Sequence, residues 1–513
     1  NTNNFTLELQ SILLRHQNEE GILIIDNCPN PIFAEAIKLR NQYNPDFRLI
    51  SLNNEYYDID SSLECERITL DPKHLQELVD NYIDQNIPEK NFGVHIREQV
   101  NILAARCPFM AIRLVKEYQQ GNPINMRSVE VLMPRLLHLN PVDDKEKLIV
   151  LETLSLFVPF PYGESYKDHY YYIINDLAIT PLFGKTFEEK RSLFHQVITH
   201  YDEKLVEQLG SWLNVRFFPI AVWLVEKWFE DCEAERLVEL IDHIQQWPDH
   251  IYKFGCNAIC KRIKYMRDNK RAYELFGRLT ALEAPFSTEK VVCSDMGSRL
   301  FLAMSSVNPC AISQCLYNVL HRKTIGWVRE HIKDDIRRNY VWALETLCFD
   351  GESFPYASKV LALLAVAENE YWGNNATGQF KQLFHIHLAG TEVNLDHRLE
   401  LIQYMKQKGS DYTLLCLECI NQAFLNNGFT RSGGSEKFGF ESKTDYMPAT
   451  TNEIIHYWNV CKDILLQWID EDPAVYERIC QLIKEQCWNW CSNGLYDIFF
   501  ALFDKMAEKL NYQ

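Results

Sequence analysis

Polar residues follow two apolar runs near the start of the chain, where they could bind a ligand. The run GILII leads straight into Asp26 and Asn27, and the run FRLIS ends at Ser51 with Asn53 close behind. The continuous run GILII is typical of a strand buried on both faces of a parallel sheet. Ligands of such sheets bind at the carboxyl ends of the strands. These four residues are therefore candidate binding residues; the alternative is that Asp26 only turns the chain.

The other candidate residues support neither catalysis nor a metal site. Cys416 and Cys419 form the only C-x-x-C pair among 16 cysteines, and no second pair matches them as a zinc site requires. Buried thiols in a reducing compartment are the simpler interpretation. His385, His387 and His397 could bind a metal, but no local carboxylate frame accompanies them. No Ser-His-Asp, Cys-His or paired-carboxylate spacing is credible, so an intrinsic enzyme is the least expected function.

Helix signals separate and follow the two expected strands. Asn30 is a good N-cap for a helix between the strands and Asp71 for a helix after them, since a proline follows each at the first helical position. Two more helices are expected on either side of Pro108, over residues 94–106 and 109–120. The order is strand, helix, strand and then a small helical bundle.

That order resembles the later half of the nucleotide-binding module of STAND NTPases, the signalling class that includes NB-ARC and NACHT proteins. GILIIDN resembles Walker B, FRLISLNN the sensor 1 strand, ITLDPKHLQELV the linker after it, LAARCPFMAIRLV the GLPLA-type segment, and LIVLETLSLFVPFPYGE the opening of the winged-helix subdomain that clamps ADP. The resemblance implies that Asp26 holds the water shell of a magnesium ion. It also implies that Ser51 and Asn53 lie near a γ-phosphate and that Pro108 packs against adenine.

The chain departs from this family pattern in two ways. A complete module needs the phosphate loop G-x-x-x-x-G-K-[ST], and the twenty residues before Gly21 do not contain it. The segment ITPLFGKT ends in Lys185 and Thr186, but it starts with Ile179 and follows Walker B, so a turn is expected there. Asn27 stands where many members carry a second acid. The chain, which begins at Asn1 as a piece of a longer protein would, is therefore expected to be no ATPase by itself and to bind no nucleotide tightly; ATP or ADP and Mg²⁺ belong to the complete protein.

Helix signals dominate from about residue 195. The segment VLALLAVA at 360–367 is apolar nearly all round, as an inner helix packed on two sides would be. About 300 residues of paired helices favour an α-solenoid of HEAT or TPR type with degenerate repeats. One outer helix carries an apolar stripe formed by Ile454, Trp458, Cys461, Leu465 and Trp468.

Two polar segments interrupt these helices. Residues 363–393 place Glu368, Glu370 and Asn375 between two apolar helices. This segment is either a ligand or interface surface or, as preferred here, a polar corner whose side chains cap two helices. Residues 430–452 have the glycines and the length of a mobile surface loop, which either contacts a partner or is disordered.

Composition restricts the partners and the compartment. The chain has 513 residues and a net charge of -18, so duplex nucleic acid is not an expected partner. Hydrophobic residues make up 47% and charged residues 24%, as in ordinary globular proteins. No apolar run is long enough to span a membrane and no signal peptide opens the chain, so a cytoplasmic protein with no membrane partner is expected.

These observations predict a mainly α protein with four parts. The parts are a partial α/β P-loop NTPase subdomain at 1–66, a small helical subdomain at 67–125, a winged-helix-like subdomain at 126–195 and an α-helical solenoid at 196–513.

The expected function is that of the regulatory and sensor part of a STAND NTPase. Its solenoid would recognise a protein target or ligand, and nucleotide-dependent homo-oligomerisation would follow, with bacterial antiviral defence as one setting. Two alternatives stay open. One is a helical scaffold or protein-interaction module with no nucleotide role. The other is a STAND-class transcription regulator, which the acidic balance disfavours.

Overall fold

The computed structural model of the chain is mainly helical, which confirms the predicted fold class at that level. Helices take 73% and strands 5% of the residues that it describes. None of the helices described is both long and apolar enough to cross a membrane. The residues described are 2–17, 19–25, 30–51, 72–87, 93–104, 107–121, 124, 133–134, 137, 139, 144–163, 166–175, 185–201, 205–209, 211–215, 217–263, 266, 269–425, 431, 437–438, 441–471 and 473–511.

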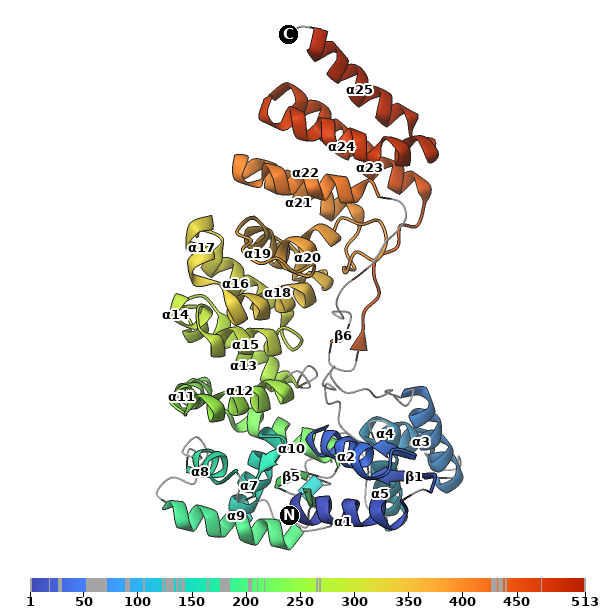
Figure 1. Cartoon of the computed structure of the whole chain (residues 1–513). Coiled ribbons are helices and arrows are strands. Elements are labelled where there is room, and N and C mark those ends of the chain that lie inside the picture. The colour runs from blue at the N-terminus through green and yellow to red at the C-terminus, as the bar shows by residue number, and fades with distance from the viewer. Residues whose placement is uncertain are drawn as a thin grey trace. The chain divides into compact units, whose positions relative to one another are not determined.

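The chain forms two compact units (Figure 1). The first unit comprises residues 1–232 and 239–262, and the second comprises residues 233–238 and 263–513. The first unit opens with an α/β arrangement of two helices and two parallel strands, with Gly21 beside Phe47 and Ile25 beside Ser51. The strand pairing predicted from the sequence is thereby confirmed. The four elements are α1 (Thr2–Arg15), β1 (Gly21–Ile25), α2 (Asn30–Tyr43) and β2 (Phe47–Ser51).

In the part of the chain that the structure describes, helices cover only one face of this two-stranded sheet. Side chains of α1 and α2 form a small core against Leu23, Ile25 and Leu49. No described helix covers the opposite face, where Ile22 is 61% and Ile24 is 59% exposed; we call this the bare face. The prediction that the first strand is buried on both faces is therefore wrong for Ile24. The run GILII is apolar at every position after the glycine, as in a strand covered on both faces. Here α1 and α2 both pack on the same face, so the side chains of the other face stay exposed.

Three helices follow the parallel strands, as the prolines and apolar spacing in the sequence predicted, whereas the predicted cap Asp71 lies outside the described residues. Their buried faces include Val79, Ile83, Val100 and Leu114. Proline stands at the first turn of two of them, where its missing N–H costs no helical hydrogen bond. The three helices are α3 (Pro72–Asn86), α4 (Gly93–Ala104) and α5 (Pro108–Gln119).

A small antiparallel sheet is interleaved with helices in the next part of the first unit. The strands lie in the order β3-β5-β4. Val206, Leu213 and Val215 are buried in the hairpin of the last two strands. This hairpin corrects the expectation of helices alone after residue 195, because VEQL and WLNV pair as antiparallel strands and bury apolar side chains. The elements are α7 (Lys145–Leu156), β3 (Phe160–Pro161), α8 (Lys167–Asn175), α9 (Phe187–Tyr201), β4 (Val206–Leu209) and β5 (Trp212–Val215).

The first unit ends with α10 and α12, and α11 crosses the boundary between the units. In the second unit, each helix packs mainly on its near neighbours in the sequence (Figure 1). The remaining helices are α10 (Phe218–Asp231), α11 (Ala234–Gln245), α12 (Asp249–Ile263), α13 (Lys270–Thr280), α14 (Glu289–Val292), α15 (Asp295–Met304), α16 (Pro309–Leu320), α17 (Ile325–His331), α18 (Asp334–Phe349), α19 (Phe354–Val366), α20 (Ala376–Gln382), α21 (Leu395–Gln407), α22 (Thr413–Ala423), α23 (Thr451–Glu471), α24 (Pro473–Ser492) and α25 (Tyr496–Asn511). Two short strands, β6 (Lys437–Phe438) and β7 (Glu441–Ser442), lie between α22 and α23.

Side-chain caps and apolar faces explain where these helices begin and how they pack. α19 is buried on several sides, with Leu361 and Leu364 at 0% exposure, so the prediction of an inner helix is confirmed. On α23 the stripe that includes Cys461 and Leu465 is buried, as its spacing predicted. Among the residues that accept a backbone N–H at a helix N-terminus are Asn269, Thr288, Ser294, Asn308, Thr324, Asn375 and Asn394.

Candidate functional site

The predicted nucleotide-binding residues are placed only in part. Ser51 ends β2 and lies beside Ile25, the residue before Asp26, so both strands end at the same edge of the sheet. That is the edge where an α/β sheet binds its ligands. Asp26, Asn27 and Asn53 lie outside the described residues. The predicted Mg²⁺ role of Asp26 therefore stays a prediction.

Pro108 opens α5, the position that its ring favours. The next residue, Phe109, stacks on Phe217 with ring centroids 3.6 Å apart and ring planes at 3°. The Arg113 guanidinium carbon lies over the Phe109 ring, 5.3 Å from its centroid. These contacts hold the start of α5. None of them reaches Ser51, so they do not bring the two predicted nucleotide-binding residues, Pro108 and Ser51, together.

Thr186 caps the start of α9, and Gly184 of the GKT sequence lies outside the described residues. The backbone N–H of Thr186 donates to Glu189 Oε2 over 2.6 Å, and Glu189 N–H donates to Thr186 Oγ1 over 3.3 Å. This reciprocal pattern is a capping box. Lys185 is engaged with Glu146 at 3.1 Å. The interpretation of Thr186 as part of a turn therefore agrees with the geometry, whereas Ile179 lies outside the described residues.

The cysteine and histidine candidates form no metal centre in the described ranges, where no cluster of three or more suitable ligands occurs. Cys416 and Cys419 are both buried. Burial raises the pKa of both thiols above its ordinary value. His385 shares a 2.9 Å hydrogen bond with Gln422 Oε1. His397 lies in the first turn of α21, within 2.7 Å of its cap Asn394.

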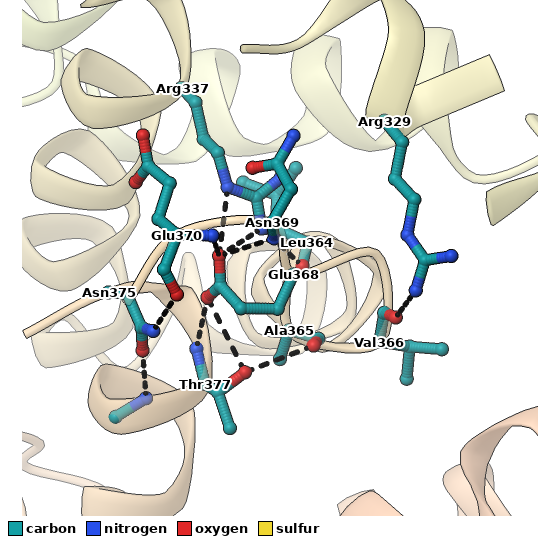
Figure 2. Close-up of polar contacts among 11 residues, drawn as sticks. Arg329, Arg337, Leu364, Ala365, Val366, Glu368, Asn369, Glu370, Asn375 and Thr377 are labelled. Atoms are coloured by element: carbon teal, nitrogen blue, oxygen red, sulfur yellow. Dashed lines mark hydrogen bonds and ion pairs between the residues drawn. The ribbon is translucent and has the colours of Figure 1, made fainter. Parts of the chain in front are cut away.

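The segment between α19 and α20 is a polar corner built around the C-terminus of α19 (Figure 2). Arg337 of α18 is fully buried, and its Nη2 donates to Leu364 O over 2.6 Å. Thr377 Oγ1 donates to Ala365 O over 3.1 Å, and Arg329 Nη2 donates to Val366 O over 3.2 Å. The last carbonyls of a helix have no partner within it, so these donors satisfy them, and two of the donors are cations at the negative end of the helix dipole.

The Glu368 carboxylate is the centre of this corner (Figure 2). Its Oε1 accepts from Arg337 Nη2 at 2.9 Å and from the backbone N–H groups of Asn369 at 3.0 Å and Glu370 at 3.1 Å. Its Oε2 accepts from the N–H of Thr377 at 3.0 Å. One carboxylate thus neutralises a buried guanidinium and pairs three backbone donors, which fixes the path of the chain between the helices.

Asn375 completes the corner. Its Oδ1 accepts from Gly378 N over 2.9 Å as the N-cap of α20, and its Nδ2 donates to Glu370 O over 2.8 Å. A Cβ at Gly378 would lie 2.0 Å from Gly373 O, so a side chain there would push the two turns apart. The preferred interpretation of 363–393 as a polar capping corner thus agrees with the geometry for Glu368 and Asn375.

The corner also presents an aromatic tip. Tyr371 is fully exposed and Trp372 is 39% exposed. The Arg338 guanidinium carbon lies 5.4 Å from the centroid of Trp372, and Arg338 also pairs with Asp335 at 2.8 Å. Trp342, four residues after Arg338 on α18, is 43% exposed on the same helix face. We call Arg338, Trp342, Tyr371 and Trp372 the aromatic tip.

This arrangement is suited to recognition. The carboxylate is held by a guanidinium and backbone N–H groups, so it is not arranged as a general base. Exposed Trp, Tyr and Arg on a rigid support are the residue types that dominate protein-binding energies. Sequence reasoning marked Glu368 and Asn375 but missed the part of the tip on α18. The available signal was the pair Arg338 and Trp342 at helical spacing, on a helix whose other aromatic residues, Tyr340 and Phe349, are buried.

No known protein family matches the chain, and neither the curated proteins nor the solved structures contain a match.

Proposed function

We propose that the chain is the regulatory and sensor part of a STAND-type NTPase. A helical solenoid would recognise a protein target, and recognition would release a nucleotide-dependent switch to a homo-oligomer, with bacterial antiviral defence as one setting. The single observation that carries this proposal is the parallel pair β1 and β2 with its bare apolar face.

A parallel sheet normally has both faces covered, and two strands alone are marginal in water. Ile22, Ile24 and Ile50 are 61%, 59% and 43% exposed on the uncovered face. Further strands and a second helical layer would bury them, and the half of a P-loop module that carries the phosphate loop would supply both. ATP or ADP with Mg²⁺ would then bind at the edge where β2 ends at Ser51. The chain by itself is proposed to have no ATPase activity.

The arrangement of α7 to β5 supports the same proposal. Helix, strand, two helices and a hairpin follow one another, and the sheet order is β3-β5-β4. A winged-helix subdomain has this order of elements, and we propose that the subdomain extends to residue 215. Its role in a STAND protein would be to hold ADP in the inactive state.

The second unit is proposed to be the sensor. Helices that pack on near neighbours support a solenoid of HEAT or TPR type, whose surfaces bind other proteins. The aromatic tip is the part of that surface best suited to a partner. With a net charge of -18 for the chain, the partner is proposed to be a protein and not a nucleic acid.

The bare sheet face gives a direct test. In the chain by itself, Ile24→Thr is expected to change the free energy of unfolding by less than about 0.5 kcal/mol, because the side chain is largely exposed. Leu23→Thr, on the covered face, is expected to cost about 1–2 kcal/mol, because it places a hydroxyl in the small core. Hydrogen exchange of the β1 amides and denaturant unfolding measure both effects.

The same pair of variants then tests the nucleotide-binding half. Joined to a segment that contains a phosphate loop, Ile24→Thr is expected to become as costly as Leu23→Thr and to weaken ADP binding. If Ile24→Thr stays neutral there, the bare face is not where the nucleotide-binding half packs, and the proposal fails.

The aromatic tip tests the sensor role. Replacing Tyr371 and Trp372 with alanine is expected to leave the melting temperature within about 2 °C, because both side chains are exposed and the Glu368 contacts persist. Target binding is expected to weaken by at least about tenfold, as loss of central aromatic anchors does. Trp488→Ala removes another exposed tryptophan of the second unit and is the matched control. Equal losses in both variants would rule out a specific role for the tip.

The alternative is a helical protein-interaction module with no nucleotide role. The aromatic tip favours this alternative as much as the main proposal, because a protein-binding surface on the second unit fits both. Nucleotide binding by the completed α/β module separates the two.

A further inference from the structure

The segment before α23 is held against earlier parts of the second unit by polar contacts. We call residues 443–449 (KTDYMPA) the strap. Its receptor, here called the socket, combines the end of α18 with the turn before α21 and consists of Asp350, Gly351, Gly390, Thr391 and Glu392. The strap was expected to be part of a mobile surface loop, and its contacts with the socket are the finding that corrects this.

Lys443 lies between two carboxylates of the socket. Its Nζ is 2.5 Å from Asp350 Oδ1 and 2.8 Å from Glu392 Oε1. Both carboxylates are also held by the chain around them. Asp350 Oδ2 accepts from Ser353 N over 3.0 Å, and Glu392 Oε1 accepts from Gly351 N over 2.7 Å. The acidic pair is thus organised by backbone groups as well as by the lysine.

The charge state of this pair agrees with its geometry. Burial raises the pKa of Asp350, but the Lys443 ammonium and the hydrogen bonds from Ser353 outweigh burial and hold the net pKa below its ordinary value. Asp350 is therefore a carboxylate at neutral pH. A nearly buried carboxylate of this kind needs a cation beside it, which Lys443 supplies.

Asp445 of the strap enters a second part of the socket. Its Oδ1 accepts from the consecutive N–H groups of Gly390 at 2.6 Å and Thr391 at 3.0 Å. Gly390 has a φ of +74°, and that left-handed conformation turns two successive N–H groups toward one anion. Arg431 Nη1 lies 3.3 Å from Asp445 Oδ2. Tyr446 N donates to Thr391 O over 2.9 Å, so backbone pairing continues along the strap.

Polar contacts carry most of this attachment. Met447 is 61% exposed, and Thr444 and Ala449 are exposed as well. The strap therefore buries little apolar surface, unlike the helices on either side of it. Segments with few buried apolar contacts open at a lower free energy than the packed core.

We propose that the socket is a binding site for an extended peptide of the pattern Lys-x-Asp-Tyr and that the strap occupies it as an internal ligand. Lysine would enter the carboxylate pair and aspartate the paired N–H groups, two residues apart along an extended chain. A partner segment with the same chemistry would compete with the strap. This inference does not depend on the nucleotide switch.

The test uses a labelled peptide of residues 441–449, ESKTDYMPA, and fluorescence anisotropy. The variant Lys443→Ala with Asp445→Ala removes both charged contacts of the strap and is expected to bind the peptide at least about tenfold more tightly than the wild-type chain, whose own strap competes at high effective concentration. Adding Asp350→Asn and Glu392→Gln to that variant is expected to abolish binding. The peptide ESDTKYMPA, which has the same composition with the two charges exchanged, is expected not to bind.

Hydrogen exchange gives a second readout that needs no added peptide. The amides of Gly390 and Thr391 donate to Asp445, so they are expected to exchange at least about tenfold faster in the Lys443→Ala, Asp445→Ala variant, and to slow again when the peptide is added. A folded variant that binds neither peptide, or that binds both equally, would overturn the proposal. Unchanged exchange at Gly390 and Thr391 would overturn it independently.

Discussion

Replacing Glu368 with alanine is expected to destabilise the second unit by about 3–5 kcal/mol, because the change leaves a buried guanidinium without its counter-ion. Arg337 is 0% exposed and keeps only its bond to Leu364 O. The N–H groups of Asn369, Glu370 and Thr377 lose their acceptor at the same time. The measurement is denaturant unfolding of the chain, in which hydrogen exchange of the α19 and α20 amides reports on the second unit.

The neighbouring carboxylate provides a matched control. Burial raises the pKa of Glu370, and Arg337 partly offsets this. Its carboxylate makes none of the backbone bonds that Glu368 makes, so Glu370→Ala is expected to cost less than about 1 kcal/mol. Glu368→Gln keeps the acceptor geometry without the charge, so we expect an intermediate cost. If Glu368→Ala and Glu370→Ala have equal effects, the carboxylate does not hold the corner.

Raising the pH from about 5 to 9 is expected to destabilise the first unit through Glu152. This residue lies on α7 and is 6% exposed. The pKa of Glu152 is raised to about 8, mainly by burial and also by the nearby Asp231 carboxylate. Lys227 opposes this shift. The folded state therefore binds the proton more tightly than the unfolded state, in which the pKa is about 4.5.

The sign of the effect follows from this difference in proton binding. The stabilisation is fully present below about pH 4.5 and is lost as the pH rises through about 8. The loss over that window amounts to roughly 3–5 kcal/mol, at about 1.4 kcal/mol per pKa unit. Glu152→Gln carries no titrating proton, so it is expected to be clearly more stable than the wild type at pH 9.

This prediction is tested by denaturant unfolding at pH 5, 7 and 9, in which hydrogen exchange of the α7 amides reports on the first unit. Glu146→Gln removes an exposed carboxylate from the same helix and is expected to leave the pH dependence unchanged. A wild-type chain whose α7 stability is flat between pH 5 and 9 would contradict the assignment to Glu152.

The sequence alone determined the local features of the fold. The cap at Asn375, the prolines that open α3 and α5, and the buried apolar segment of α19 each depend on residues within a turn or two of one another. Such signals are complete within a short window, since a cap needs only its own oxygen and the next turn of backbone. The parallel pairing of β1 with β2 also followed from the strand, helix and strand order.

The tertiary structure decided which apolar faces are covered and which distant charges meet. Ile24 and Leu23 look alike in the sequence, yet only Leu23 faces the core, because α1 and α2 pack on one side of the sheet. Arg337 and Glu368 are 31 residues apart, and Lys443 and Asp350 are 93 residues apart. Neither pair has a sequence signal, because an ion pair depends on the distance between two side chains in space, and the packing of whole helices sets that distance.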